Sequence, residues 1–222
     1  MNIVWYGQSC FKITAQGQKK SKQWTSLVVD PFDERTGLKL PKMEANILLI
    51  THDHFDHSNR NAFKKEPFTI DSPGEYELND IFIKGIHSFH DNSEGSERGA
   101  NTIYVIEGEG MRVCHMGDFG QEELTSKQLE SIGEVDILMV PVGGVYTIDG
   151  KGATKVISQI EPRVVIPMHY KVEGLNIEIE DLEQFLKAIG EKGVSREEKL
   201  AIQEKDLPSG EMRVVPLAPQ AK

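Results

Sequence analysis

The chain has 222 residues, a length that suits one domain with a sizeable core, and we expect residues 1–222 to form a single domain. Its hydrophobic fraction of 38% and its charged fraction of 27% are typical of a globular protein and argue against a disordered or membrane-embedded chain. A formal net charge of -10 gives no sign of a basic surface that would bind the phosphate backbone of a nucleic acid. We therefore expect no nucleic-acid partner and no membrane partner.

The first residues show no basic, apolar leader, and the two cysteines, Cys10 and Cys114, lie in apolar strand-like segments. Buried reduced thiols are typical of a cytoplasmic protein, and we expect that location. The densest basic cluster, at Lys19, Lys20 and Lys22, is interpreted as a solvated hairpin tip. An exposed strand edge would permit a homo-oligomer.

The first half of the chain is rich in predicted strands. Alternating and β-branched residues predict strands over residues 2–6, 10–14, 24–29, 46–51, 81–89, 102–107 and 111–116. A turn at Gly7-Gln8-Ser9 separates the first two strands, and Asp30-Pro31 ends the third. The strand over 46–51 is a short run of β-branched and aliphatic residues, which suits a buried strand.

The second half alternates helices with strands. Helices are predicted over residues 125–132, around 153–160 and around 182–189, and strands over 135–140, 164–167, 200–203 and 212–217. Thr125 and Gln128 have the spacing of a capping box, and Pro162 ends the second helix. The βαβ unit around that helix implies two parallel neighbouring strands. The pattern predicts an α/β (α+β) layered domain, with sheets covered by helices.

The segment Thr51-His52-Asp53-His54-Phe55-Asp56-His57 begins where the predicted strand over 46–51 ends, and it offers the imidazoles of His52, His54 and His57 and the carboxylate of Asp56 as ligands. Such groups bind Zn²⁺, Mn²⁺ or Fe²⁺. In extended backbone, alternate side chains share a face, so His52 and His54 can hold one metal. The chain must then turn to bring Asp56 and His57 to a second metal. The alternative is a solvated, His-rich loop with no bound metal, and we do not favour it.

Other predicted strands also end in ligand residues. His90 follows the strand over 81–89, Asp118 follows the strand over 111–116, and His169 follows the strand over 164–167. Open α/β folds gather their sites at the carboxyl ends of strands. With the His-rich segment, these residues supply enough groups for a two-metal hydrolytic site.

The segment His52-x-His54-x-Asp56-His57 resembles the hallmark of the metallo-β-lactamase superfamily. The chain looks most similar to the Zn-dependent hydrolase and ascorbate-6-phosphate lactonase-like branch, and the resemblance covers nearly its whole length. The motifs that carry it are Trp5-Tyr6-Gly7-Gln8-Ser9, Asp30-Pro31-Phe32, Pro73-Gly74-Glu75-Tyr76-Glu77, His90-Asp91 with Arg98-Gly99, His115-Met116-Gly117-Asp118, Pro141-Val142-Gly143-Gly144 and Ile166-Pro167-Met168-His169-Tyr170. It implies an αββα sandwich of two mixed sheets flanked by helices.

The resemblance also implies a ligand set for two divalent metal ions, with zinc preferred and manganese or iron as alternatives. It assigns His52, His54 and His90 to the first metal, Asp56, His57 and His169 to the second, and Asp118 as a bridge between them. A hydroxide between the metals would attack the substrate, and Asp56 would assist proton transfer. Asp30 is expected to support the His-rich loop from behind.

Some positions leave alternatives open. We prefer His90 to His87 as the third ligand, because His90 stands at the strand end. His115 is interpreted as a hydrogen-bonded core histidine, since strand alternation turns it from Asp118. Gln8 stands where many members of the family carry histidine, so a role for this turn in the site is in doubt.

Substrate-binding candidates lie in the loops that follow strands. Arg98 would grip a phosphate or carboxylate, or else brace its own loop. The further candidates are Asn101, Tyr146 and Tyr170. We expect the Gly143-Gly144 pair to let the backbone pass close to the site.

The leading functional hypothesis is hydrolysis of a small ester, lactone or phosphoester. An iron-dependent oxidoreductase or dioxygenase on the same fold is the alternative, because His-rich sites accept iron. A nuclease is disfavoured by the acidic balance, and an inactive metal-binding module would be expected to lose ligands.

Overall fold

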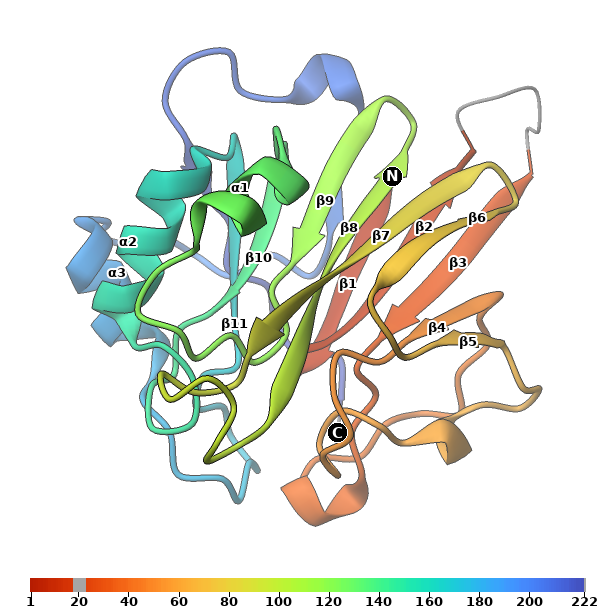
Figure 1. Ribbon diagram of the computed structural model, residues 1–222, viewed down its shortest axis with the longest axis horizontal. Coiled ribbons are helices and arrows are strands. Elements are labelled where there is room, and N and C mark those ends of the chain that lie inside the picture. The colour runs from red at the N-terminus through yellow and green to blue at the C-terminus, as the bar shows by residue number, and fades with distance from the viewer. Residues whose placement is uncertain (18–22, 222) are drawn as a thin grey trace.

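The computed structural model describes residues 1–17 and 23–221, so the predicted hairpin tip at Lys19, Lys20 and Lys22 lies outside the described residues. Within the described ranges the chain forms two mixed β-sheets that pack against each other, with α-helices beside one of them (Figure 1). The predicted layered arrangement of two mixed sheets is confirmed.

The first sheet has six strands among the described residues, in the spatial order β12-β1-β2-β3-β4-β5. These strands span Leu200–Ala201 (β12), Asn2–Gly7 (β1), Cys10–Gln16 (β2), Trp24–Val29 (β3), Ile47–Leu49 (β4) and Phe68–Ile70 (β5). The strands from β12 to β3 pair antiparallel, whereas β3, β4 and β5 run parallel. Burial alternates along β1, so Ile3 and Trp5 enter the core.

The second sheet has seven strands in the described part of the chain, in the order β13-β11-β10-β9-β8-β7-β6. They span Arg213–Val214 (β13), Val164–Met168 (β11), Ile137–Pro141 (β10), Met111–His115 (β9), Ala100–Gly108 (β8), Ile81–Phe89 (β7) and Gly74–Leu78 (β6). β10 and β11 are parallel neighbours, as the βαβ pattern predicts, and every residue of both is buried. Such strands are buried on both faces, which explains their continuous apolar sequence.

The α-helices lie on the side of the second sheet (Figure 1). They span Ser126–Ile132 (α1), Gly150–Ile160 (α2) and Leu182–Ile189 (α3), and short 3-10 helices span Glu34–Thr36, Arg60–Ala62 and Glu204–Asp206. The predicted capping box is present: Thr125 and Gln128 each accept a hydrogen bond from the other's backbone N–H. No described helix has the length and apolar character that would cross a bilayer.

Two strands were not anticipated from the sequence. β5 has three residues, which is too short to show a period, and β6 is an edge strand without a buried residue. The predicted strands over 46–51, 200–203 and 212–217 are shorter in the structure. At the carboxyl end of β4 the chain leaves the sheet to form the His-rich loop, so this shortening has a functional consequence.

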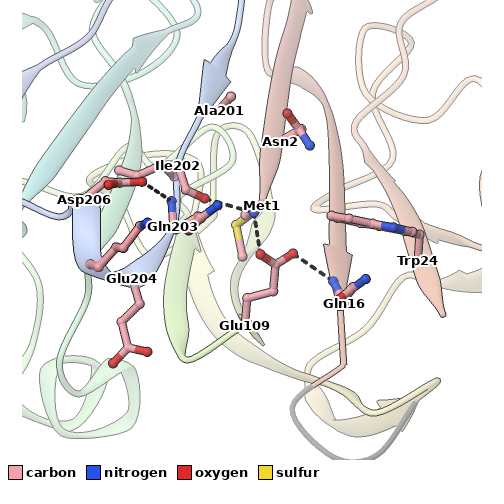
Figure 2. Close-up of a pocket in the computed structure, with 11 residues that line it drawn as sticks. Met1, Asn2, Gln16, Trp24, Glu109, Ala201, Ile202, Gln203, Glu204 and Asp206 are labelled. Carbon is pink, nitrogen blue, oxygen red and sulfur yellow. Dashed lines mark hydrogen bonds and ion pairs between the residues drawn. The ribbon is translucent and has the colours of Figure 1, made fainter. Parts of the chain in front are cut away.

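A hollow of about 650 Å³ opens at the edge of the first sheet, beside β12 (Figure 2). The Met1 α-ammonium reaches Glu109 Oε2 at 2.5 Å and donates to Ile202 O at 2.9 Å, which ties the first residue to the β8–β9 turn and to the chain after β12. Trp24 also lines this hollow. None of the predicted ligand residues lines it, so it is separate from the predicted site.

Tyr104 joins the two sheets. It is fully buried in β8, and its hydroxyl donates to Ile50 O at 2.9 Å, just after β4. We predict that Tyr104→Phe lowers the free energy of unfolding by about 1–3 kcal/mol, because it leaves a buried carbonyl without a donor. Urea denaturation measures this change. The matched control is Tyr76→Phe, whose hydroxyl donates to Ser72 O in an exposed hydrogen bond. Equal effects of the two substitutions would contradict the prediction.

Candidate metal centre

The predicted ligands from four separate strand ends lie in two adjoining groups. His52, His54 and His90 form the first group, and Asp56, His57, Asp118 and His169 form the second. Within each group, one donor atom from each residue lies within 4.8 Å of the others. The two groups have the membership that the family resemblance implies for the two metal positions.

Asp118 connects the two groups. Its Oδ2 lies 3.2 Å from Nε2 of His90 in the first group, and 3.0 Å and 3.3 Å from Nε2 of His57 and His169 in the second. Ser9 donates its hydroxyl to the other oxygen, Oδ1, at 3.1 Å. A carboxylate held from behind and facing both groups has the placement that a bridging ligand needs.

The His-rich loop turns in the way that the sequence requires. His57 N and Ser58 N both donate to His54 O, at 2.9 Å and 3.0 Å. This tight turn places His54 and Asp56 in different groups although they are only two residues apart. The backbone path thus converts a local motif into ligands for two positions.

Two glycines allow the backbone to approach the ligands closely. Gly117 has φ +58, and a Cβ atom there would lie 2.3 Å from Asn101 Oδ1. A Cβ at Gly143 would lie 2.1 Å from His169 O. Any larger residue would push apart the loops that carry Asp118 and His169, so the expected close passage at Gly143 is confirmed.

Asp30 lies behind the His-rich loop with no exposed surface. Its Oδ1 accepts from Thr51 N at 2.8 Å, and its Oδ2 accepts from Thr51 Oγ1 at 2.7 Å. Oδ2 also lies 3.0 Å from Nδ1 of His57. A carboxylate only accepts hydrogen bonds, so Nδ1 of His57 carries a proton and, in the neutral ring, Nε2 keeps the lone pair that a metal needs.

Opposite charges balance one another inside the second group. Burial alone would lower the pKa of His57, but Asp118, Asp56 and Asp30 outweigh it and raise this pKa well above its ordinary value. Burial alone would raise the pKa of Asp118, but His169 and His57 hold it well below its usual range. A proton on His57 therefore supplies positive charge among the carboxylates, and a cation that binds here displaces it.

The first group is chemically suited to a cation. Burial lowers the pKa of His52 well below its ordinary value, which keeps the ring in the neutral form that binds metals. Its Nδ1 contacts Thr51 Oγ1 at 2.9 Å, whereas its buried Nε2 has no hydrogen-bond partner among the described residues. Imidazole and carboxylate donors together fit Zn²⁺, and they also accept Mn²⁺ or Fe²⁺.

A cleft of about 380 Å³ opens onto both groups. It is lined by His54, Phe55, Asp56, His90, Arg98, Asp118, Tyr146, His169 and Ile177. Phe55 and Tyr146 are 39% and 42% exposed, which makes an apolar rim around the polar floor. The cleft therefore suits a small molecule with an apolar part.

Arg98 reaches this cleft from a loop that is organised by Asp91. The Asp91 carboxylate accepts four backbone N–H bonds from residues 93–98, and these bonds outweigh burial and lower its pKa to about 2. The Arg98 guanidinium donates to Val145 O at 3.4 Å, and its Cζ lies 5.8 Å from the centre of the Tyr146 ring. Of the four substrate-binding candidates, Arg98 and Tyr146 line the cleft.

Asn101 and Tyr170 do not line the cleft. Asn101 is buried, donates to Ser88 Oγ and Met116 O, and accepts from Asp118 N at 3.0 Å. Tyr170 is fully buried and donates its hydroxyl to Leu217 O at 3.4 Å. These contacts correct the substrate-binding prediction for both residues, because their polar groups are used inside the protein.

The remaining histidines lie outside the two groups. His87 is exposed on β7 and packs its ring against Phe89. His115 is fully buried, with Nε2 placed 2.9 Å from Ser9 O and Nδ1 accepting from Gly117 N, as expected of a hydrogen-bonded core histidine. The sequence leaves a role for Gln8 open, and in the structure its Nε2 lies 3.2 Å from Asp56 Oδ2.

The chain is similar to several known proteins. A family model described as the beta-lactamase superfamily domain matches residues 2–169. A UPF0173 metal-dependent hydrolase of Thermoplasma volcanium is 30% identical over 200 residues, which cover 77% of this chain and 83% of that protein. A UPF0173 protein of Pyrococcus abyssi is 30% identical over 197 residues, covering 78% of this chain and 85% of the relative.

Solved structures show the same fold. A Thermotoga maritima protein, assigned as a Zn-dependent hydrolase of the metallo-beta-lactamase superfamily, has a TM-score of 0.77 and 36% identity, covering 97% of this chain and 98% of the other. A metallo hydrolase of Ignicoccus hospitalis has a TM-score of 0.63 at 19% identity, covering 91% of this chain and 99% of the other, which supports the fold alone.

Asp30 supplies a sharp test of ligand orientation. In Asp30→Asn, an amide N–H replaces the Oδ2 acceptor, so Nδ1 of His57 must accept and the ring proton moves to Nε2. We predict that metal affinity falls about 10–100-fold, as is typical when the group behind a ligand is changed. Titration against a chelator of known affinity measures it. Unchanged affinity in the folded variant would contradict this role of Asp30.

Proposed function

Because the chain belongs to the metallo-β-lactamase superfamily, we propose that it is a metal-dependent hydrolase that uses two divalent ions, zinc by preference, to cleave a small ester, lactone or phosphoester. The observation that carries this proposal is the pair of ligand groups with Asp118 between them. The names of the related UPF0173 metal-dependent hydrolases and of the Thermotoga maritima protein support it.

The proposed ligands are His52, His54 and His90 for the first ion, Asp56, His57 and His169 for the second, and Asp118 for both. The bound ions supply Lewis-acid polarisation of the scissile bond and lower the pKa of the attacking water.

Asp56 is the proposed proton acceptor. It lines the cleft, and its side chain is 11% exposed. Burial alone would raise its pKa, but the charge of His57 and hydrogen bonds to His169 and His57 lower it, so the carboxylate is ionised at neutral pH. An ionised carboxylate in the cleft can accept a hydrogen bond, and then a proton, from the attacking water.

The cleft walls suggest how the substrate is held. Arg98 offers N–H donors to an anionic group, such as a carboxylate or a phosphate. Phe55, Tyr146 and Ile177 supply apolar surface for the remainder of the molecule. A compact substrate with one anionic group and an apolar part fits these walls.

Elemental analysis of protein purified without added metal or chelator tests the proposal. We expect about two zinc or manganese ions per chain, as in other two-metal hydrolytic sites. His52→Ala and His169→Ala should each lower the metal content and abolish hydrolysis in a screen of lactones, esters and phosphoesters.

Two matched substitutions control for effects on folding. Asp53 is exposed within the same His-rich loop, and His87 is an exposed histidine, and neither belongs to a ligand group. Asp53→Asn and His87→Ala should therefore keep both the metal and the activity. Iron as the native metal, or protein that stays metal-free after reconstitution, would contradict the proposed zinc hydrolase.

Arg98 should act on substrate binding. We predict that Arg98→Ala raises KM for an anionic ester about 10–100-fold, because a charge-assisted contact is lost, and that KM for a neutral ester of equal size changes little. Steady-state kinetics on the two esters measures the difference. Arg60, which is exposed and pairs with Asp71 outside the cleft, gives the control Arg60→Ala. Equal effects of Arg98→Ala on both esters would contradict anion recognition.

A further inference from the structure

The turn that joins β1 to β2 lies inside the proposed metal centre. Gln8, at this turn, has no exposed surface, and its backbone carbonyl accepts from His169 N at 3.0 Å and from Trp5 Nε1 at 2.9 Å. The next residue, Ser9, donates its hydroxyl to Asp118. A turn of the first sheet is thereby fastened to two strand ends of the second sheet that carry proposed ligands.

The Gln8 side chain points at the second ligand group. Its Nε2 lies 3.2 Å from Asp56 Oδ2 and 3.3 Å from His169 Nε2. A carboxylate only accepts hydrogen bonds, so the amide nitrogen faces Asp56 and donates to it. This donor is neutral and keeps its protons at every ordinary pH. It can therefore orient Asp56 without weakening the negative charge that attracts a cation.

The backbone conformation of Gln8 and its buried amide oxygen both cost free energy, so a turn with a purely structural role would not favour glutamine here. Gln8 has φ +49, a left-handed conformation that glycine adopts without steric cost. Its buried Oε1 also has no hydrogen-bond partner among the described residues, an arrangement that costs free energy. Such strain persists where surrounding contacts fix it, most often at functional sites.

We propose that Gln8 is a positioning residue of the metal centre, which orients the Asp56 carboxylate and so sets the affinity of the second ligand group for its ion. The inference rests on the proposed metal-dependent function, because it assigns Gln8 to one of the two proposed metal positions. The Gln8 side chain forms its hydrogen bonds with Asp56 and His169, which belong to the second group. Metal affinity of the first group, formed by His52, His54 and His90, should therefore not depend on Gln8.

The test is a titration of metal-free protein with Co²⁺, in which binding is monitored by visible absorption and by calorimetry. Gln8→Met keeps the length of the side chain but removes the donor. We expect it to weaken Co²⁺ binding at the second ligand group (the second step) about 10–100-fold, with an altered spectrum for that ion. Binding at the first ligand group (the first step) should be unchanged. Gln8→His, whose ring N–H can donate to the same oxygen, should restore much of the second step.

The control is Gln128→Met. Gln128 is also a buried glutamine, but its amide donates to His87 O and accepts from Thr125 N, away from both ligand groups. This variant should lose stability without losing either binding step. If Gln8→Met does not fold, Gln8→Asn carries the same test, because it keeps the amide and withdraws it by one methylene.

A double-mutant cycle tests whether Gln8 acts through Asp56. In an Asp56→Ala background, Gln8→Met should have no further effect on the second step, because the acceptor that Gln8 orients has been removed. An additive effect would overturn the proposal, as would equal losses at both steps or no loss at all.

These outcomes are separate from failure of the proposed function. Wild-type protein that binds two ions but hydrolyses nothing would contradict the function and leave the role of Gln8 standing. Wild-type protein that hydrolyses a substrate while Gln8→Met binds both ions normally would overturn only the role of Gln8. Wild-type protein that binds no Co²⁺ would overturn both.

Discussion

The arrangement of the site depends on one buried carboxylate, that of Asp30. A charge without contact with water must be met by hydrogen-bond donors, and Asp30 finds them in Thr51 and His57. Asp30 follows β3 and Thr51 follows β4, so their contact fixes where the chain leaves two neighbouring strands. The contact of Asp30 with His57 fixes the ring proton on Nδ1 and leaves Nε2 for a cation. One electrostatic requirement therefore controls both the backbone path and the chemistry of the ligand.

In the second ligand group, attraction between opposite charges offsets the free-energy cost of removing those charges from water. Asp118 and His57 are both buried, and each would be costly alone. Placed 3.0 Å apart, they stabilise each other's charged forms. Ser9 donates its hydroxyl to Oδ1 of Asp118, and Asn101 accepts from the backbone N–H of Asp118. These two residues therefore hold Asp118 in place although they do not line the cleft.

Much of the centre could be predicted because its chemistry is concentrated in the sequence. The His-rich segment is local, and His90, Asp118 and His169 stand at strand ends, which meet at one edge of such sheets. Gln8 could not be placed in this way, since its contact with Asp56 joins residues 48 apart, one in the β1–β2 turn and the other in the loop after β4 of the same sheet. Asn101 and Tyr170 are predicted as loop residues that follow strands and face the substrate. In the structure Asn101 lies inside β8, and Tyr170, just after β11, is fully buried with its hydroxyl bonded to Leu217 O. The short strands β5 and β6 lack enough residues or buried positions to show a period.

The spread of the ligands along the chain also bears on how the protein folds. Gln8 and His169 are 161 residues apart, and contacts over such separations form only after much chain entropy has been lost. The segment from His52 to His57, in contrast, is complete in the unfolded chain and can already hold an ion there. An ion that binds both states stabilises the native state by less than its affinity for the finished centre would suggest. Metal present during synthesis would thus meet a local binding segment before the distant ligands assemble around it.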